Sequence, residues 1–308
     1  MINGDWSSDV CSSDLNYDWK GSRYSQNQVT LFGLKYNKLL STTADFDKTM
    51  EENPAIALSF RNQFIPKFAY TYTFDRGFGK TRDDQHFTLQ AGFTEGGNLF
   101  AGIWSLAGNK GQKELFGTLF SQFVKATLQM VYSKRITGEQ RIVGRVYAGA
   151  AHAYGNSQEV PYAEQFYAGG ANSVRAFAVR SIGPGSYHSN VDGNGYYDQT
   201  GTFRFEMNAE YRFPIVSVLK GAVFVDAGNI WLLKDDPMRS GGTLNSNFFR
   251  ELALGTGLGL RLDMGMIVVR ADLGVGLHLP YDTGKSGYYN IGRFKDSLAL
   301  NLAIGYPF

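Results

Sequence analysis

The chain has 308 residues, of which 43% are hydrophobic and 19% are charged, and its formal net charge is +2. This balance excludes a disordered chain, and so small a net charge gives no electrostatic reason to expect nucleic acid as a partner. The 37 glycines against 8 prolines, together with 15% aromatic residues, favour many strands joined by tight turns.

The first fifteen residues do not resemble the rest of the chain. The stretch from Asp5 to Leu15 reads DWSSDVCSSDL, has no strand or helix period, and contains Cys11, the single cysteine of the chain. It resembles the in-frame translation of a sequencing adapter, with a polar N-terminal linker as the alternative. We therefore expect residues 1–15 to be non-native and residues 16–308 to be the C-terminal part of a longer, N-terminally truncated domain.

From about residue 26 onward, apolar residues alternate with polar or small ones, which is the period of a β-strand. No apolar run approaches the length of about 18 residues that a membrane-spanning helix needs. The alternation predicts roughly ten strands, near residues 27–38, 54–75, 85–95, 118–135, 140–154, 201–213, 220–231, 252–263, 267–277 and 297–308.

The last predicted strand shows the alternation most clearly. Leu298, Leu300, Leu302 and Ile304 share one face, which ends in aromatic residues, whereas the other face is small or polar. A strand of about eleven residues at ~3.4 Å each, tilted by about 45°, spans ~25 Å, the height of an outer-membrane apolar band. The mean hydropathy of −0.24 is compatible with such strands, because half of each strand faces a polar lumen.

The connections between the predicted strands alternate in length. Short turns are expected near residues 137–139, 214–219 and 264–265, and long loops rich in Gly, Asn and Asp near 156–200, 232–250 and 279–294. Short turns at one end and long loops at the other are typical of outer-membrane barrels. We therefore predict an all-β fold, an antiparallel transmembrane β-barrel.

No motif for catalysis or for a cofactor stands out. The four histidines are not spaced as metal pairs, and without a native cysteine a zinc site is not expected. The glycines of residues 255–259 resemble a dinucleotide loop but lie in a predicted strand, and the acidic stretch 192–198 lacks the glycine and distal glutamate of a calcium loop. We expect no enzyme activity, no cofactor and no metal site.

The long loop near 156–200 contains Arg175 between apolar neighbours, and its length allows it to fold into a barrel. An arginine held inside needs carboxylates, because an unpaired buried charge is expensive. Glu210 and Asp226 lie on the polar faces of the next two predicted strands. We expect Arg175 to bridge these two carboxylates, the alternative being solvated lumen charges and an arginine that binds lipid headgroups or nothing.

Four motifs in this half of the chain resemble, in order and spacing, the BamA/TamA family, the bacterial surface antigen superfamily. They are the loop motif GGANSVRAF at 169–177, the strand NAEYRFP at 208–214, the strand FVDAGNIW at 224–231, and the final phenylalanine. The family usually has glycine at the position of Ala176. The residues that carry the resemblance are Gly169, Gly170, Val174, Arg175, Ala176 and Phe177 in the loop, Glu210, Phe224, Asp226 and Gly228 on the strands, and Tyr306 and Phe308 at the end.

The resemblance implies a 16-stranded barrel preceded by periplasmic polypeptide-transport-associated domains. It places Arg175 inside the lumen against Phe224 and Asp226. It also makes the last strand, with Tyr306 and Phe308, one side of a lateral gate.

The same resemblance implies a function in the bacterial outer membrane. Such a barrel inserts or translocates unfolded outer-membrane or autotransporter client proteins, with the lipid bilayer and periplasmic or inner-membrane accessory proteins as further partners. Three alternatives remain open at this point: a two-partner-type secretion pore, a membrane anchor for a hydrolase encoded upstream, and a plain diffusion porin.

Overall fold

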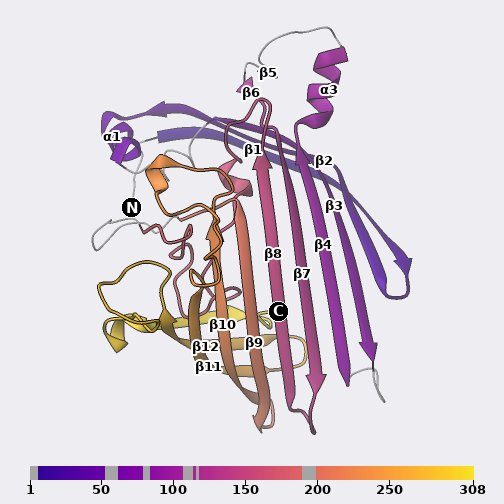
Figure 1. The fold of residues 1–308 in the computed structure, drawn as a ribbon. Helices are drawn as coiled ribbons and strands as arrows, with labels where there is room; N and C mark the ends of the chain where they lie inside the picture. Colours follow the sequence, from indigo (N-terminus) through magenta and orange to yellow (C-terminus); the bar gives the residue numbers. More distant parts are fainter. Residues whose placement is uncertain (1–5, 53–61, 79–83, 107–113, 116–117, 189–198) are drawn as a thin grey trace. The chain divides into compact units, whose positions relative to one another are not determined.

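The computed structural model describes residues 6–52, 62–78, 84–106, 114–115, 118–188 and 199–308. Eleven strands form one sheet, in which neighbours along the chain also pair with each other (Figure 1). The order in the sheet is β1 (Trp6–Ser22), β2 (Ser25–Thr42), β3 (Gln63–Phe78), β4 (Gln85–Gly96), β7 (Phe123–Arg135), β8 (Arg141–Ala153), β9 (Phe203–Val216), β10 (Leu219–Trp231), β11 (Ala253–Asp263), β12 (Val268–His278) and β13 (Leu298–Ile304).

The remaining elements are short and lie in the connections. Two helices, α1 (Ala44–Glu52) and α3 (Asn98–Leu106), follow β2 and β4. The short strands β5 (Glu114–Leu115) and β6 (Thr118–Leu119) pair with each other. None of the helices in the described part of the chain is long and apolar enough to cross a membrane.

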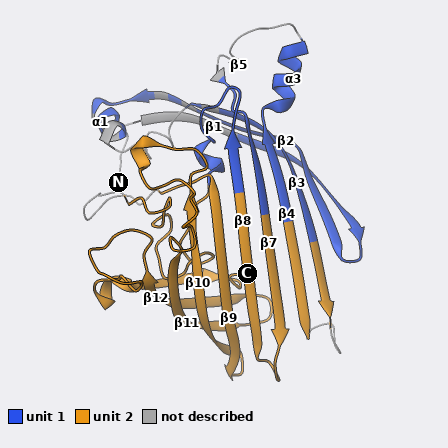
Figure 2. Ribbon diagram, viewed as in Figure 1, with its two compact units in different colours: residues 1–73, 91–127, 150–165 blue, residues 74–90, 128–149, 166–308 orange. Residues whose placement is uncertain are grey.

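The chain divides into two compact units (Figure 2). Unit 1 comprises residues 1–73, 91–127 and 150–165, and unit 2 comprises residues 74–90, 128–149 and 166–308. Within unit 1, α3 packs Ala101 against Phe64 and Phe120. Strands β9 to β13 and the segment that contains Arg175 belong to unit 2, which therefore holds every residue of the candidate site.

The strands of unit 2 bury their polar face and expose their apolar face. On β11, Arg261 is 0% exposed whereas Leu258 is 63% exposed. On β9, Glu206 and Glu210 are buried, and Met207 between them is exposed. This is the reverse of a soluble sheet, and it is the pattern of strands whose apolar side faces lipid and whose polar side faces a lumen.

Glycines on β11 and β12 leave room on the buried face. A Cβ at Gly274 would meet the backbone of Arg175 and Ala176, and a Cβ at Gly255 would meet the side chain of Ala176. A Cβ at Gly257 would meet the ring of Phe224. The glycine-rich sequence 255–259 therefore belongs to a strand that the loop approaches closely, and its resemblance to a dinucleotide loop has no structural counterpart.

The predicted strands and loops agree well with the observed ones in unit 2. The turns after β7, β9 and β11 are short, and the connections after β8, β10 and β12 are long. The prediction of one strand over 118–135 was wrong, because the chain forms β6, leaves the strand, and begins β7 at Phe123. Of the predicted strand 54–75, residues 54–61 lie outside the described part, and β3 begins at Gln63.

Two further elements differ from the sequence prediction. Helix α3 occupies a stretch for which no helix was expected; its first turn is capped by Glu95, whose carboxylate accepts a hydrogen bond from the amide of Asn98 at 3.0 Å. Residues 5–15 have no sequence alternation, yet Trp6–Leu15 form the first part of β1, which pairs with β2 throughout its length. Pairing of backbone groups needs no particular side chains, so the non-native origin of residues 1–15 stays a prediction.

Candidate functional site

The tip of the loop before β9 is held by its own backbone. The amide of Gly170 donates to the carbonyl oxygen of Phe177 at 2.8 Å, and the amide of Gly169 donates to the hydroxyl of Ser173 at 2.9 Å. Both glycines have positive φ, 96° and 88°. A Cβ at Gly169 would also meet the backbone of Ala178, so this turn requires glycine at that position.

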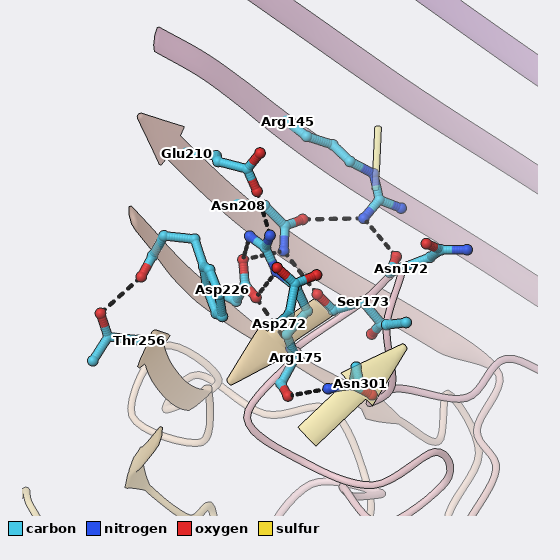
Figure 3. A network of polar contacts seen from close by, with 12 residues as sticks. Arg145, Asn172, Ser173, Arg175, Asn208, Glu210, Asp226, Thr256, Asp272 and Asn301 are labelled. Carbon is cyan, nitrogen blue, oxygen red and sulfur yellow. Dashed lines mark hydrogen bonds and ion pairs between the residues drawn. The ribbon is translucent and has the colours of Figure 1, made fainter. Parts of the chain in front are cut away.

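Arg175 lies at this tip and is 0% exposed. Its Nε and Nη2 donate to the two carboxylate oxygens of Asp226, each at 2.8 Å, and its backbone amide donates to the same carboxylate at 3.0 Å. Its Nη1 donates to Glu210. The guanidinium carbon lies 3.6 Å from the ring centre of Phe224. Figure 3 shows Arg175 beside Asp226 and Glu210.

The contacts of Arg175 match both the charge and the planar shape of its guanidinium. The planar fork of a guanidinium matches a carboxylate in two parallel bonds, and the aromatic face below it adds a cation–π contact. Burial alone would lower the pKa of Arg175, but Asp226 and Glu210 outweigh it and raise that pKa. The guanidinium therefore stays charged, and each carboxylate needs it, because a buried charge without a partner is costly.

A second set of charges surrounds this pair. Glu210 also accepts from Arg212 at 2.6 Å and from Arg261 at 3.1 Å. Arg261 continues to Asp272 at 2.6 Å, and Asp272 accepts from Arg270 at 2.8 Å. Strands β9, β11 and β12 are thus joined by ion pairs on the buried face, although β10 lies between β9 and β11 in the sheet.

The loop tip is bound to this network at further points. Arg270 donates to the carbonyl oxygen of Ala171 at 2.9 Å and bonds to the side chain of Asn172. Ser173 donates to Glu206, whose other oxygen accepts from Arg145 on β8 at 3.2 Å. The loop tip is therefore held by Arg270 on β12 and by Glu206 on β9.

The residues expected from the sequence occupy this site as follows. Val174 is buried near Gly228, where an added Cβ would meet it, and Phe177 packs near Gly276. Ala176 is buried, and positive φ among described residues other than glycine occurs at Arg180 and Ser217 only. Alanine at this position therefore has an ordinary backbone and is unstrained.

The end of the chain approaches the same network. Arg212 donates to the carbonyl oxygen of Phe308 at 3.4 Å, and its guanidinium lies 4.3 Å from the ring centre of Tyr306. The ring of Phe308 is 5.8 Å from the guanidinium of Arg175, whereas Tyr306 bonds to Asp263 at 3.1 Å instead. Phe308 thus lies beside Arg175, and Tyr306 lies beside Arg212.

The sequence prediction missed several members of the network. They are Arg145, Asn208, Arg261, Arg270, Asp272 and Asn301, and they all lie on the polar face of their strands. Their period-2 positions were a usable signal for which face they occupy. Which of them meet depends on the register between strands, which a single sequence does not give.

The structure offers no candidate metal site within its described ranges, where no group of three or more His, Cys, Asp or Glu side chains lies together. The acidic stretch 192–198 lies outside those ranges. What the site does offer is a charged, closely packed contact between a loop and strands β8, β9, β10, β12 and β13.

Comparisons with known proteins show the family of the chain. Residues 14–295 match the model of the Omp85 superfamily domain. An outer membrane protein assembly factor BamA from Neisseria meningitidis serogroup B is 27% identical over 201 residues, which are 64% of this chain and 22% of that protein.

Two solved structures share the fold. The crystal structure of BamA from Haemophilus ducreyi lacking POTRA domains 1–3 has a TM-score of 0.58 at 14% identity, over 97% of this chain and 55% of that chain. CdiB from Escherichia coli has a TM-score of 0.58 at 16% identity, over 98% and 47%. The chain thus spans about half of these solved chains and less of the curated relative. The chain belongs to the Omp85 superfamily, whose members are located in the bacterial outer membrane.

Proposed function

We propose that this chain is the C-terminal part of the barrel of an outer-membrane assembly or translocation factor, which inserts or translocates client proteins without catalysis or a cofactor. Its partners are the lipid bilayer, unfolded outer-membrane or autotransporter clients, and periplasmic or inner-membrane accessory proteins. The relative that is 27% identical carries the name of an assembly factor, which supports the client class.

The observation that carries the proposal is the contact of Arg175 with Asp226 and Glu210. A diffusion porin has no need to fix a loop arginine by two carboxylates at the centre of its lumen. In our proposal, this contact locks the loop inside the lumen and sets the state of the barrel that accepts a client. The loop tip also reaches β13, the strand that the proposal assigns to one side of the gate.

The test replaces Arg175 by Ala in the full-length protein, in a strain that has no other copy. We expect the variant to reach the outer membrane, where its folding is checked by heat-modifiable gel migration, and the amounts of folded client proteins to fall several-fold. The matched control is Arg180→Ala, five residues further along the loop, whose guanidinium stacks over Tyr167 at 4.7 Å. This control should leave the client amounts unchanged.

Other outcomes decide against the proposal. Client amounts that stay unchanged in a correctly folded Arg175→Ala protein would contradict it. Loss of a single secreted protein, with other outer-membrane proteins unaffected, would instead assign the chain to a two-partner-type secretion pore. A hydrolase domain encoded upstream, whose activity depends on this barrel only for attachment, would make the chain an anchor.

A further inference from the structure

Asn208, on β9, is 4% exposed, and its side chain contacts a cation, an anion and the loop tip. Its side-chain oxygen accepts a hydrogen bond from Arg145 on β8 at 3.0 Å (Figure 3). Its side-chain nitrogen donates to Asp226 at 2.9 Å and to the backbone carbonyl oxygen of Ser173 at 3.0 Å. In the register of β9 and β10, Asn208 lies directly opposite Asp226.

The charges on both sides set the orientation of this amide. An asparagine side chain accepts only through its oxygen and donates only through its nitrogen. The guanidinium of Arg145 can only donate, and an ionised carboxylate such as that of Asp226 can only accept. An amide rotated by half a turn would place donor against donor and acceptor against acceptor, and it would lose all three bonds. Asn208 is therefore held in one orientation.

One side of this amide belongs to a group of contacts around Ser173, which we call the Ser173 anchor. The hydroxyl of Ser173 accepts from the amide of Gly169 at 2.9 Å and donates to Glu206, which is 0% exposed. The other oxygen of Glu206 accepts from Arg145 at 3.2 Å. The Ser173 anchor thus consists of Ser173, Glu206 and Arg145, and all three belong to unit 2.

The other side of the amide reaches the contact of Arg175 with Asp226, which we call the Arg175 anchor. One carboxylate oxygen of Asp226 accepts from Asn208 at 2.9 Å and from Nη2 of Arg175 at 2.8 Å. Bonds in such a row polarise one another, so each strengthens the next. The row of Arg145, Asn208, Asp226 and Arg175 thus runs from β8 to the loop tip.

We propose that Asn208 is a positioning residue that couples the two anchors, so that the loop tip is held or released at both of them together. Arg145 fixes the amide of Asn208, and that amide fixes the carboxylate that receives Arg175. Arg145 therefore acts on the Arg175 anchor from β8 without touching Arg175. The proposal concerns how the loop is held, and its test uses no client protein, so it stands or fails separately from the proposed function.

Two backbone amides report the two anchors separately. The amide of Gly169 donates to the hydroxyl of Ser173 and reports the Ser173 anchor. The amide of Arg175 donates to Asp226 at 3.0 Å and reports the Arg175 anchor. Hydrogen exchange of an amide follows the local opening of its bond. If the anchors are coupled, a change at Arg145 alters the exchange of both amides.

The first measurement compares the full-length wild-type protein with Arg145→Met in lipid nanodiscs, after heat-modifiable gel migration has confirmed folding. Glu206 keeps Arg204 as a partner at 2.8 Å, so the variant leaves no carboxylate unpaired. We expect exchange, resolved to single residues, to accelerate about tenfold at Gly169 and about fivefold at Arg175, as the loss of one or two hydrogen bonds predicts. The ladder amides of β11 report opening of the whole barrel and should stay constant.

The matched control is Arg141→Met, on the same strand, which removes a hydrogen bond of 2.9 Å to Ser133 and should leave both loop amides unchanged. The second measurement repeats Arg145→Met in an Asn208→Ala background, with Asn208→Leu as a second background of closer side-chain volume. Without the asparagine, Arg145→Met should still accelerate the Gly169 amide and should no longer affect the Arg175 amide.

Three results would overturn the proposal. An Arg175 amide that does not respond to Arg145→Met in the folded protein would show that the anchors are independent. A response of the same size with and without Asn208 would show that the coupling passes through the bond of Arg145 to the backbone of Asn172, at 3.3 Å. Equal acceleration of the β11 amides would show that Arg145 stabilises the barrel as a whole.

Discussion

The side-chain amide of Asn301, on β13, donates a hydrogen bond to the backbone carbonyl oxygen of Arg175 at 2.7 Å. Asn301 lies opposite Asp272 in the register of β12 and β13. Arg175 thus binds Asp226 through its side chain and amide, and its carbonyl oxygen accepts the hydrogen bond from the last strand. Any displacement of β13 at this position must break or stretch a bond to the loop tip.

Asn301→Ala should loosen the loop tip without unfolding the barrel. The change removes one hydrogen bond of about 1 kcal/mol and leaves a poorly solvated carbonyl oxygen unpaired. Hydrogen exchange of the amides in residues 169–177 should accelerate about fivefold. Leu300→Ala, on the exposed face of the same strand, is the control and should leave these rates unchanged; equal rates in both variants would contradict the coupling.

Glu210→Gln should destabilise the barrel strongly. Glu210 is the shared partner of Arg175, Arg212 and Arg261, so neutralising it leaves three arginines with less compensation. Removing one partner of a buried ion pair costs about 3–5 kcal/mol. Unfolding in urea, followed by gel migration in detergent, should show the loss, and Asp236→Gln in the long loop after β10 should cost far less.

Gly274→Ala should displace the loop. The new Cβ would meet the backbone of Arg175 and Ala176, and backbone cannot move aside as a flexible side chain does. Overpacking of this kind costs about 1–3 kcal/mol. The matched control is Gly292→Ala, where no heavy atom lies within 4 Å of the added Cβ. A Gly274→Ala protein as stable as Gly292→Ala would show that the loop does not pack there.

Ala176→Gly, which introduces the residue usual in the BamA/TamA family, should lower stability slightly. The backbone at this position does not need positive φ, so glycine gains nothing in the folded state and adds freedom to the unfolded chain. We expect a loss of about 0.5–1 kcal/mol in urea unfolding. A gain in stability would mean that the loop prefers a left-handed conformation at this residue.

The sequence allowed much of unit 2 to be predicted, because its strands alternate strictly and its turns are short. The approach of Arg175 to Glu210 and Asp226 was expected from the length of the loop, the charge of the arginine and the polar faces of the next two strands, and the structure places the three in contact. What that contact does for the protein stays a prediction. Arg270 and Asn301 could not be assigned to the loop tip, since their contacts depend on strand register and on the path of a long loop.

Outside unit 2 the prediction was weaker for a physical reason. The helix α3 follows β4 after a single residue, Gly97, and buries only Ala101 among its nine residues, so burial imposes no clear helical period on its sequence. For Trp6–Leu15, the first part of β1, the side chains do not alternate, and the strand is seen from its backbone pairing with β2. Local patterns predict elements only where burial imposes a period.

The most direct test of the account is a double-mutant cycle between Arg175 and Asp226, using Arg175→Met, Asp226→Asn and both together in the full-length protein. The account predicts that the free energies of unfolding are strongly non-additive, with a coupling of about 1.5–3 kcal/mol, because each single change leaves the other charge buried. Effects that add within about 0.5 kcal/mol would contradict it, since independent sites behave in that way.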